Sequence, residues 1–128
     1  MARMRVLVVE DEELVRTILR EVLDDEGFHV VEARTGDEAV SLIDGPGRLH
    51  AVVTDIHMPG ARDGLAVGRH ARRRYPGIPV VYCTGRPDLL PDAPSDADVF
   101  GQPEALVRKP YVPSEIVAFL RGWLPAVS

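Results

Sequence analysis

The stretch VVTDIHMPG, Val52–Gly60, decides the fold class of this chain. Together with the alanine before it, it opens on an apolar run rich in β-branched valine, which predicts a strand over Ala51–Thr54. The run does not alternate with polar residues, as expected of a strand that is covered on both faces of a parallel sheet. A carboxylate, Asp55, follows directly, and the proline–glycine pair at the end of the stretch predicts a turn.

Strands of the same kind recur on both sides of this stretch. We expect further strands at Val6–Val9, Phe28–Val31, Ile78–Cys83 and Ala105–Val107, and helices at Leu14–Leu23, Asp37–Ile43, Leu65–Tyr75 and Ser114–Leu124. This alternation predicts a doubly wound α/β fold, in which helices cover both faces of a parallel sheet. The segment between Cys83 and Ala105 contains four prolines, so we expect a fourth helix in this segment to be short or irregular.

Composition and charge limit the possible classes of protein. A length of 128 residues suits one domain over residues 1–128. Because the chain stops just after the last predicted helix, we expect no output domain, and the start at Met1 favours a complete chain. The net charge of −5 argues against a nucleic-acid-binding surface, so the arginines at Arg69–Arg74 are interpreted as the solvated end of a helix. No apolar run approaches the ~20 residues of a membrane span, and no signal peptide is recognisable, so we expect a cytoplasmic protein.

Chemically active side chains follow the predicted strands at their carboxyl ends. In a parallel sheet these ends meet at one edge, where ligands bind. The side chains expected at this edge are Glu10 and Asp11 after the first strand, Asp55 after the third, Thr84 and Gly85 after the fourth, and Lys109 after the fifth. The sequence therefore predicts a cluster of carboxylates with one hydroxyl and one ammonium group.

Three carboxylates in one place repel each other unless a cation lies among them. The candidate ligands are all oxygens, which favours a hard cation, and Mg²⁺ in particular. Asp55 could then attack a phosphoryl group and form an acyl phosphate. The Thr84 hydroxyl and the Lys109 ammonium could stabilise the charge on the phosphoryl oxygens, and Gly85 leaves room for a backbone N–H to approach them.

Lys109 is the only lysine among 15 basic residues, and all the others are arginine. Arginine presents a planar fork, whereas lysine presents a compact charge on a flexible stem. A site crowded with carboxylates, a metal ion and a phosphoryl group favours the compact charge. The composition thus indicates that Lys109 has a role that arginine would not fill.

These residues lie in motifs that resemble the receiver domains of two-component response regulators over essentially the whole chain. The matching pieces are VLVVEDE at Val6–Glu12, ARTGDEAV at Ala33–Val40, VVTDIHMPG at Val52–Gly60, DGL at Asp63–Leu65, VVYCTG at Val80–Gly85 and VRKP at Val107–Pro110. The resemblance implies a (βα)₅ flavodoxin-like fold with strand order 2-1-3-4-5. It also implies that Asp55 accepts a phosphoryl group from a sensor histidine kinase or a histidine phosphotransfer protein and then switches binding of a downstream partner.

The resemblance further implies a role for each site residue. Mg²⁺ would be bound by Asp11, by Asp55, by the backbone carbonyl of His57 and, through water, by Glu10. Thr84 and Lys109 would contact the phosphoryl group, and the Lys109–Pro110 bond would be cis. The protein would be a monomer or a weak homodimer, and would act as a phosphoacceptor switch rather than as an enzyme.

Three features depart from the family pattern. Receiver domains usually carry an aromatic residue three positions before the lysine, where this chain has Leu106. The segment between Thr84 and Lys109 is longer than usual, and the loop Met58–Gly64 has one extra residue. We therefore expect the output face to be reshaped and the usual coupling between threonine and aromatic residue to be altered.

Two other functions remain open on the sequence. Leu106 is compatible with a degenerate receiver that binds partners without being phosphorylated. The same aspartate, metal, threonine and lysine also occur in phosphohydrolases similar to haloacid dehalogenases. These enzymes need a second acid two residues after the nucleophile, where this chain has His57, which argues against that reading.

Overall fold

A computed structural model of the protein describes residues 3–86 and 104–124. Strands and helices alternate through most of this part of the chain. The strands are β1 (Arg5–Val9), β2 (His29–Ala33), β3 (Ala51–Asp55), β4 (Val80–Thr84) and β5 (Glu104–Arg108), and the helices are α1 (Glu13–Asp25), α2 (Gly36–Asp44), α3 (Gly64–Arg74) and α4 (Pro113–Trp123). The expected irregular fourth helix lies outside the described residues.

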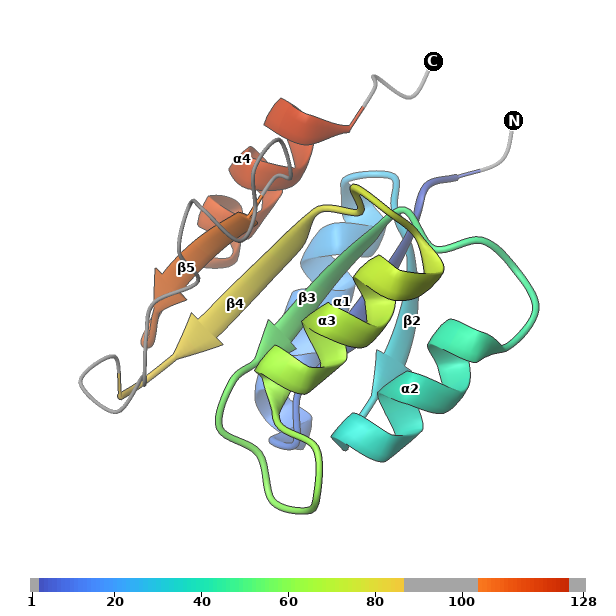
Figure 1. Cartoon of the computed structure of the whole chain (residues 1–128). Helices are drawn as coiled ribbons and strands as arrows, with labels where there is room; N and C mark the ends of the chain where they lie inside the picture. Colours follow the sequence, from blue (N-terminus) through green and yellow to red (C-terminus); the bar gives the residue numbers. More distant parts are fainter. Residues whose placement is uncertain (1–2, 87–103, 125–128) are drawn as a thin grey trace.

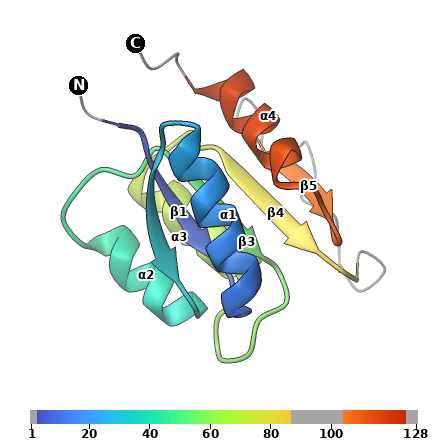
Figure 2. The same cartoon turned by 180° about the vertical axis from the view of Figure 1, so that it is seen from behind.

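The strands form one parallel sheet in the order β2-β1-β3-β4-β5, which confirms the predicted fold class and strand order. Helices α2 and α3 cover one face (Figure 1), and α1 and α4 cover the other (Figure 2). All residues of β3 are buried, as its uninterrupted apolar run predicts. No helix in the described ranges is long and apolar enough to cross a membrane.

Helix α1 buries only part of its apolar side chains. Leu19 and Leu23 lie in the core, whereas 71% of Leu14 and 45% of Ile18 remain exposed. The first two turns of α1 therefore present an apolar surface next to the carboxyl edge of the sheet.

Two glycines bring loops close to the sheet edge. A Cβ atom on Gly64 would lie 2.0 Å from the backbone oxygen of Asp55, so only glycine lets α3 begin at this point. The preceding residue, Asp63, caps the helix by accepting a hydrogen bond from the Ala66 N–H. At the start of α2, a Cβ atom on Gly36 would lie 2.3 Å from the Arg62 carbonyl oxygen. Gly36 and Gly64, which belong to the motifs ARTGDEAV and DGL, thus allow the loop between β3 and α3 to pack closely against its neighbours.

Candidate functional site

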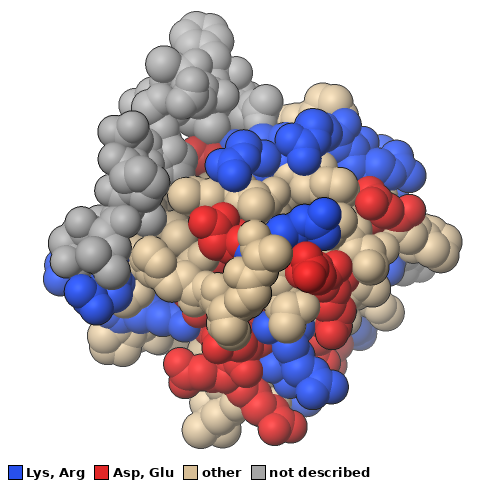
Figure 3. Space-filling model, turned by 60° about the horizontal axis from the view of Figure 1, so that its bottom comes forward, with Lys and Arg blue, Asp and Glu red and all other residues tan. Residues whose placement is uncertain are grey.

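Three carboxylates meet at the carboxyl edge of the sheet, as predicted. Glu10 and Asp11 follow β1, and Asp55 is the last residue of the neighbouring strand β3. Each offers a ligand oxygen, and these oxygens all lie within 4.8 Å of one another. Figure 3, which turns this edge toward the reader, shows several patches of acidic side chains on it, with basic side chains between and around them. The donor set suits a hard cation such as Mg²⁺.

The Lys109 ammonium connects two of these carboxylates. Its Nζ donates to Glu10 Oε1 at 2.7 Å and to Asp55 Oδ2 at 3.1 Å. The Lys109–Pro110 bond is cis, as the resemblance implied. The lysine backbone N–H donates to the Thr84 carbonyl at 2.8 Å, which ties the ends of β4 and β5 together. The single lysine thus lies against Asp55, where the sequence placed it.

Glu10 is buried and held from several sides. Its second carboxylate oxygen accepts a hydrogen bond from the Glu12 N–H at 3.1 Å. Its backbone carbonyl accepts one from the Arg16 guanidinium at 2.9 Å, and Arg16 also donates to Glu32 at 3.2 Å. Sequence reasoning missed Arg16, which positions Glu10 from the first turn of α1. The only sign of this role in the sequence is that Arg16 lies among the apolar residues that recur at helical spacing in α1.

Burial raises the pKa of both Asp55 and Glu10 above the usual carboxylate range. For Asp55 the Lys109 ammonium opposes this shift, and for Glu10 the hydrogen bond from Lys109 does the same. Burial of Lys109 itself favours the neutral amine, but the hydrogen bond to Glu10 and the charge of Asp55 outweigh it, so the net pKa of Lys109 is raised. The ammonium and the carboxylates therefore stabilise each other's charged forms.

Thr84 and Gly85 lie beside this cluster. Thr84 is fully buried and directly follows Cys83, which pairs in register with Asp55 on the adjacent strand. The Thr84 hydroxyl accepts a hydrogen bond from the Arg86 N–H at 3.0 Å. A Cβ atom on Gly85 would meet only the Lys109 Cβ, at 3.9 Å, so steric crowding in this structure does not require glycine there. The contacts of both residues with a phosphoryl group stay predictions.

His57 and Asp11 are the exposed members of the predicted metal site. Asp11 belongs to the carboxylate cluster. His57 follows Asp55 by two residues in the loop that leads to α3. The use of its backbone carbonyl as a ligand stays a prediction.

Leu106, in the position expected for a switch aromatic, is 40% exposed on β5. Its register partner on β4 is Tyr82, an aromatic residue that is buried. A Cβ atom on Gly68 would lie 2.0 Å from the Tyr82 hydroxyl oxygen, so glycine at this position of α3 makes room for the ring. Burial and the Glu104 carboxylate raise the pKa of Tyr82 to about 12. The register partner of Leu106 is thus an aromatic residue of β4 whose hydroxyl lies against α3.

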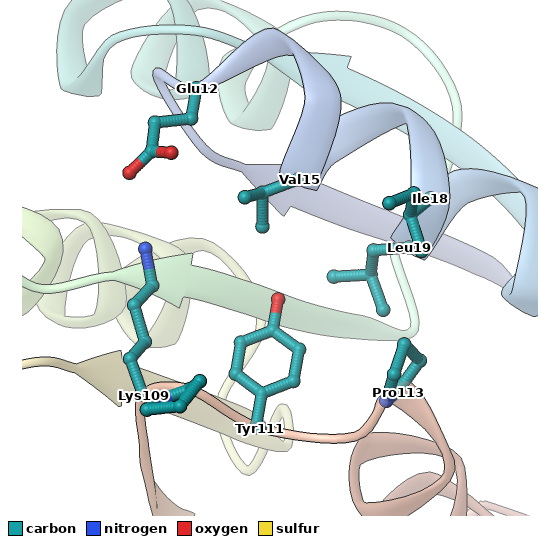
Figure 4. Close-up of a pocket in the computed structure, with 8 residues that line it drawn as sticks. Glu12, Val15, Ile18, Leu19, Lys109, Tyr111 and Pro113 are labelled. Atoms are coloured by element: carbon teal, nitrogen blue, oxygen red, sulfur yellow. The ribbon is translucent and has the colours of Figure 1, made fainter.

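An apolar groove opens beside Lys109, between α1 and the connection from β5 to α4 (Figure 4). It has a volume of about 530 Å³ and is lined by Glu12, Val15, Ile18, Leu19, Lys109, Pro110, Tyr111 and Pro113. Tyr111 points from the β5 side toward α1, while Glu12 and Lys109 lie at one end of the groove. The exposed Leu14 and Val112 extend the apolar surface around it.

The family model of the response regulator receiver domain matches residues 6–121 of this chain. The chain belongs to the response regulator receiver domain family. Its fold and the arrangement of the carboxyl edge agree with this assignment, and the family places it in a two-component system.

Curated relatives of this receiver domain include longer regulators. Response regulator MprA of Mycobacterium sp. (strain KMS) is 36% identical over 97% of this chain, which covers 52% of that protein. Transcriptional regulatory protein TcrA of Mycobacterium tuberculosis is 36% identical over 92% of this chain and 45% of its own length. The receiver domain thus spans about half the length of these relatives.

Solved structures share the fold over nearly all of the receiver domain. A response regulator receiver protein from Sinorhizobium medicae has a TM-score of 0.78 and 26% identity, covering 94% of this chain and 93% of that one. Response regulator TrrA from Thermotoga maritima, solved in complex with Mg(2+)-BeF, has a TM-score of 0.75 and 29% identity, covering 94% of this chain and 99% of that one.

Proposed function

We propose that Asp55 accepts a phosphoryl group from a histidine of a sensor kinase or a phosphotransfer protein, and that the modified domain changes which protein it binds. The observation that carries this proposal is the Lys109 ammonium, which joins Asp55 to Glu10 beside Asp11. Such an arrangement combines a carboxylate nucleophile with a cation that can move from the carboxylate to a phosphoryl oxygen.

The carboxyl edge also has the composition of a magnesium site. Asp11 and Asp55 would bind Mg²⁺ directly, together with the His57 carbonyl, and Glu10 would act through water. The carboxylate oxygens of Glu10, Asp11 and Asp55, clustered within 4.8 Å, fit the preference of this ion. When bound, Mg²⁺ supplies positive charge that stabilises the phosphoryl oxygens. The Mg(2+)-BeF complex of the related TrrA supports the same assignment for this chain.

The residues of this chain divide the transfer between them. An Asp55 carboxylate oxygen forms a bond to phosphorus while the bond between phosphorus and the histidine nitrogen breaks, and the electron pair stays on that nitrogen. Lys109 shifts from the carboxylate to a phosphoryl oxygen, and the Thr84 hydroxyl donates to another. Because Lys109 already contacts Asp55 and Thr84 ends the adjacent strand, only local side-chain movement would be needed to reach the phosphoryl oxygens.

The phosphodonor would dock in the apolar groove between α1 and the β5–α4 connection. This groove opens beside Lys109, so a helix placed in it would bring its histidine to Asp55. The exposed Leu14 and Ile18 provide apolar contact area for such a helix. The downstream partner would bind a reshaped output face, since Leu106 replaces the usual aromatic residue. If the protein has only the receiver domain, this partner would be a separate protein.

Intact-mass measurement after incubation with Mg²⁺ and acetyl phosphate tests the proposal. We expect a single phosphoryl adduct that is lost slowly and is absent in Asp55→Asn and in EDTA. Asp25→Asn, which removes an exposed carboxylate at the end of α1, is the matched control and should form the adduct normally.

Two outcomes would contradict the proposal. No adduct, together with no change in backbone amide shifts on addition of beryllofluoride, would identify a receiver that is not phosphorylated. Rapid multiple turnover of a phosphate monoester would instead identify a phosphohydrolase.

A further inference from the structure

A second cavity lies at the opposite edge of the sheet, where the strands begin. It has a volume of about 300 Å³, at the lower end of the range for small-molecule sites. Four chain segments line it: Met4 before β1, Arg48–His50 before β3, Tyr75–Pro79 before β4, and Trp123 and Leu124 at the end of α4. We call this cavity the amino-edge pocket. Its lining is mixed, because apolar and aromatic side chains alternate with the polar side chains of Arg48 and His50, and none of its lining residues is acidic.

Arg48 lines the amino-edge pocket, and Arg5 and Arg74 contact residues that line it. The guanidinium carbon of Arg48 lies 5.9 Å from the centre of the Tyr75 ring, and that of Arg74 lies 4.9 Å from it. Arg5 donates to the Arg48 carbonyl at 3.2 Å. Within residues 3–86 and 104–124, none of these three arginines forms an ion pair. In a chain with a net charge of −5, this is a local concentration of uncompensated positive charge.

His50 adds a neutral donor to the lining. Its Nδ1 accepts a hydrogen bond from the Arg5 backbone N–H at 3.0 Å, so in the neutral ring the proton resides on Nε2. Burial lowers the pKa of His50, and the charges of Arg48 and Arg5 lower it further, which favours this neutral form. Arg48 and His50 therefore give the lining N–H donors, which favour a ligand rich in acceptors.

We propose that the amino-edge pocket binds a small phosphate monoester that carries a flat aromatic or heteroaromatic ring. The ring packs among Tyr75, Trp123 and the prolines of the lining, and the phosphate is held by Arg48 and His50. A phosphate offers three acceptor oxygens to these donors, one more than a carboxylate. The ligand also places negative charge among Arg5, Arg48 and Arg74, where the described chain provides none.

The only tryptophan of the chain, Trp123, lines the pocket and reports on binding directly. Phenyl phosphate serves as the probe, and the measurement is the emission of Trp123 excited at the red edge of its absorption, in EDTA. We expect a saturable change with phenyl phosphate and a much weaker response to phenol, which lacks the charge. Inorganic phosphate, which lacks the ring, should also bind more weakly.

Variants separate this pocket from the acidic edge and from general charge effects. Arg48→Gln should weaken binding about tenfold or more, since a hydrogen bond to a charged group contributes ~1.5–3 kcal/mol. Arg73→Gln removes an equal charge from an exposed neighbouring position and should bind like the wild type, as should Asp55→Asn.

Three results would overturn the proposal: no saturable change in the wild type, an equal response to phenol, or an equal loss in Arg73→Gln and Arg48→Gln. Circular dichroism of Arg48→Gln checks that it remains folded. If it unfolds, Tyr75→Leu replaces it, because Tyr75 lines the pocket and the proposal places the ligand ring against it; this variant should also bind phenyl phosphate more weakly, and unchanged binding would contradict the proposal.

Discussion

The Lys109 ammonium allows a quantitative test of how the acidic edge is held together. Its nitrogen lies 3.1 Å from an Asp55 oxygen and 2.7 Å from a Glu10 oxygen, and its side chain is only 20% exposed. Unit charges 3.1 Å apart attract each other by about 5 kcal/mol at an effective dielectric constant of about 20. Desolvation and side-chain entropy offset part of this attraction, and removing one partner of a buried pair costs ~3–5 kcal/mol. We therefore expect Lys109→Met to lower the free energy of unfolding by about 3 kcal/mol in the absence of metal.

Urea denaturation in EDTA of the wild type, Lys109→Met, Asp55→Asn and the double variant measures this effect. In the Lys109→Met background, Asp55→Asn removes a carboxylate that is left beside Glu10 and Asp11 without its cation. The double variant should therefore be more stable than Lys109→Met, with a coupling free energy of at least ~1 kcal/mol. Mg²⁺ should stabilise Lys109→Met more than the wild type, because it meets one more uncompensated negative charge.

Arg108→Met is the matched control, since it removes an exposed cation from the adjacent position in β5. It should change the free energy of unfolding by less than ~0.5 kcal/mol. An equal loss in Arg108→Met, or a double variant no more stable than Lys109→Met, would refute the idea that the ammonium holds the carboxylates together.

Two further predictions concern the loops at either edge of the sheet. Gly64→Ala should lower the free energy of unfolding by at least about 1–3 kcal/mol, because its Cβ would lie 2.0 Å from the Asp55 backbone oxygen. Thermal denaturation measures this loss. Gly122→Ala in α4, whose Cβ would meet nothing within 4 Å, is the control and should be neutral or stabilising. His50 has a lowered pKa in the folded protein, so the unfolded chain takes up more protons below its ordinary pKa of ~6.5 and stability falls as pH decreases from there. Urea titrations should show a smaller loss between pH ~6.5 and ~5 in His50→Asn, whose side-chain oxygen can still accept from the Arg5 N–H; equal slopes would contradict this account.

The acidic edge was predictable because parallel strands bring their carboxyl ends together. Once Ala51–Thr54 and its neighbours were identified as strands, the positions of Asp55, Glu10 and Lys109 followed from chain order and topology. Each of these residues directly follows or ends a strand, so errors of a residue or two in strand boundaries did not change the edge on which they lie.

Contacts that depend on packing between distant elements were not predictable in the same way. Arg16 reaches back from α1 to the Glu10 carbonyl and across to Glu32, and an arginine at that spacing is otherwise a normal surface residue of a helix. Tyr82 occupies space that exists only because Gly68 faces it from α3. The contacts of Arg16 and of Tyr82 cannot be recognised from residue spacing in the sequence, since each joins segments whose relative position is set by the whole fold.

The engagement of Glu10 has a consequence for the order in which a cation would enter the acidic edge. One carboxylate oxygen of Glu10 is held by Lys109 and the other by the Glu12 N–H. Asp11 is exposed and forms no hydrogen bond or ion pair in the described part of the chain. If Mg²⁺ binds as proposed, Asp11 would be the carboxylate free to bind it first, and the Lys109 ammonium would leave Glu10 afterwards. Lys109, which lies between Glu10 and Asp55, would then occupy part of the site until the metal is bound, so metal association should show two kinetic phases, of which only the first depends on metal concentration.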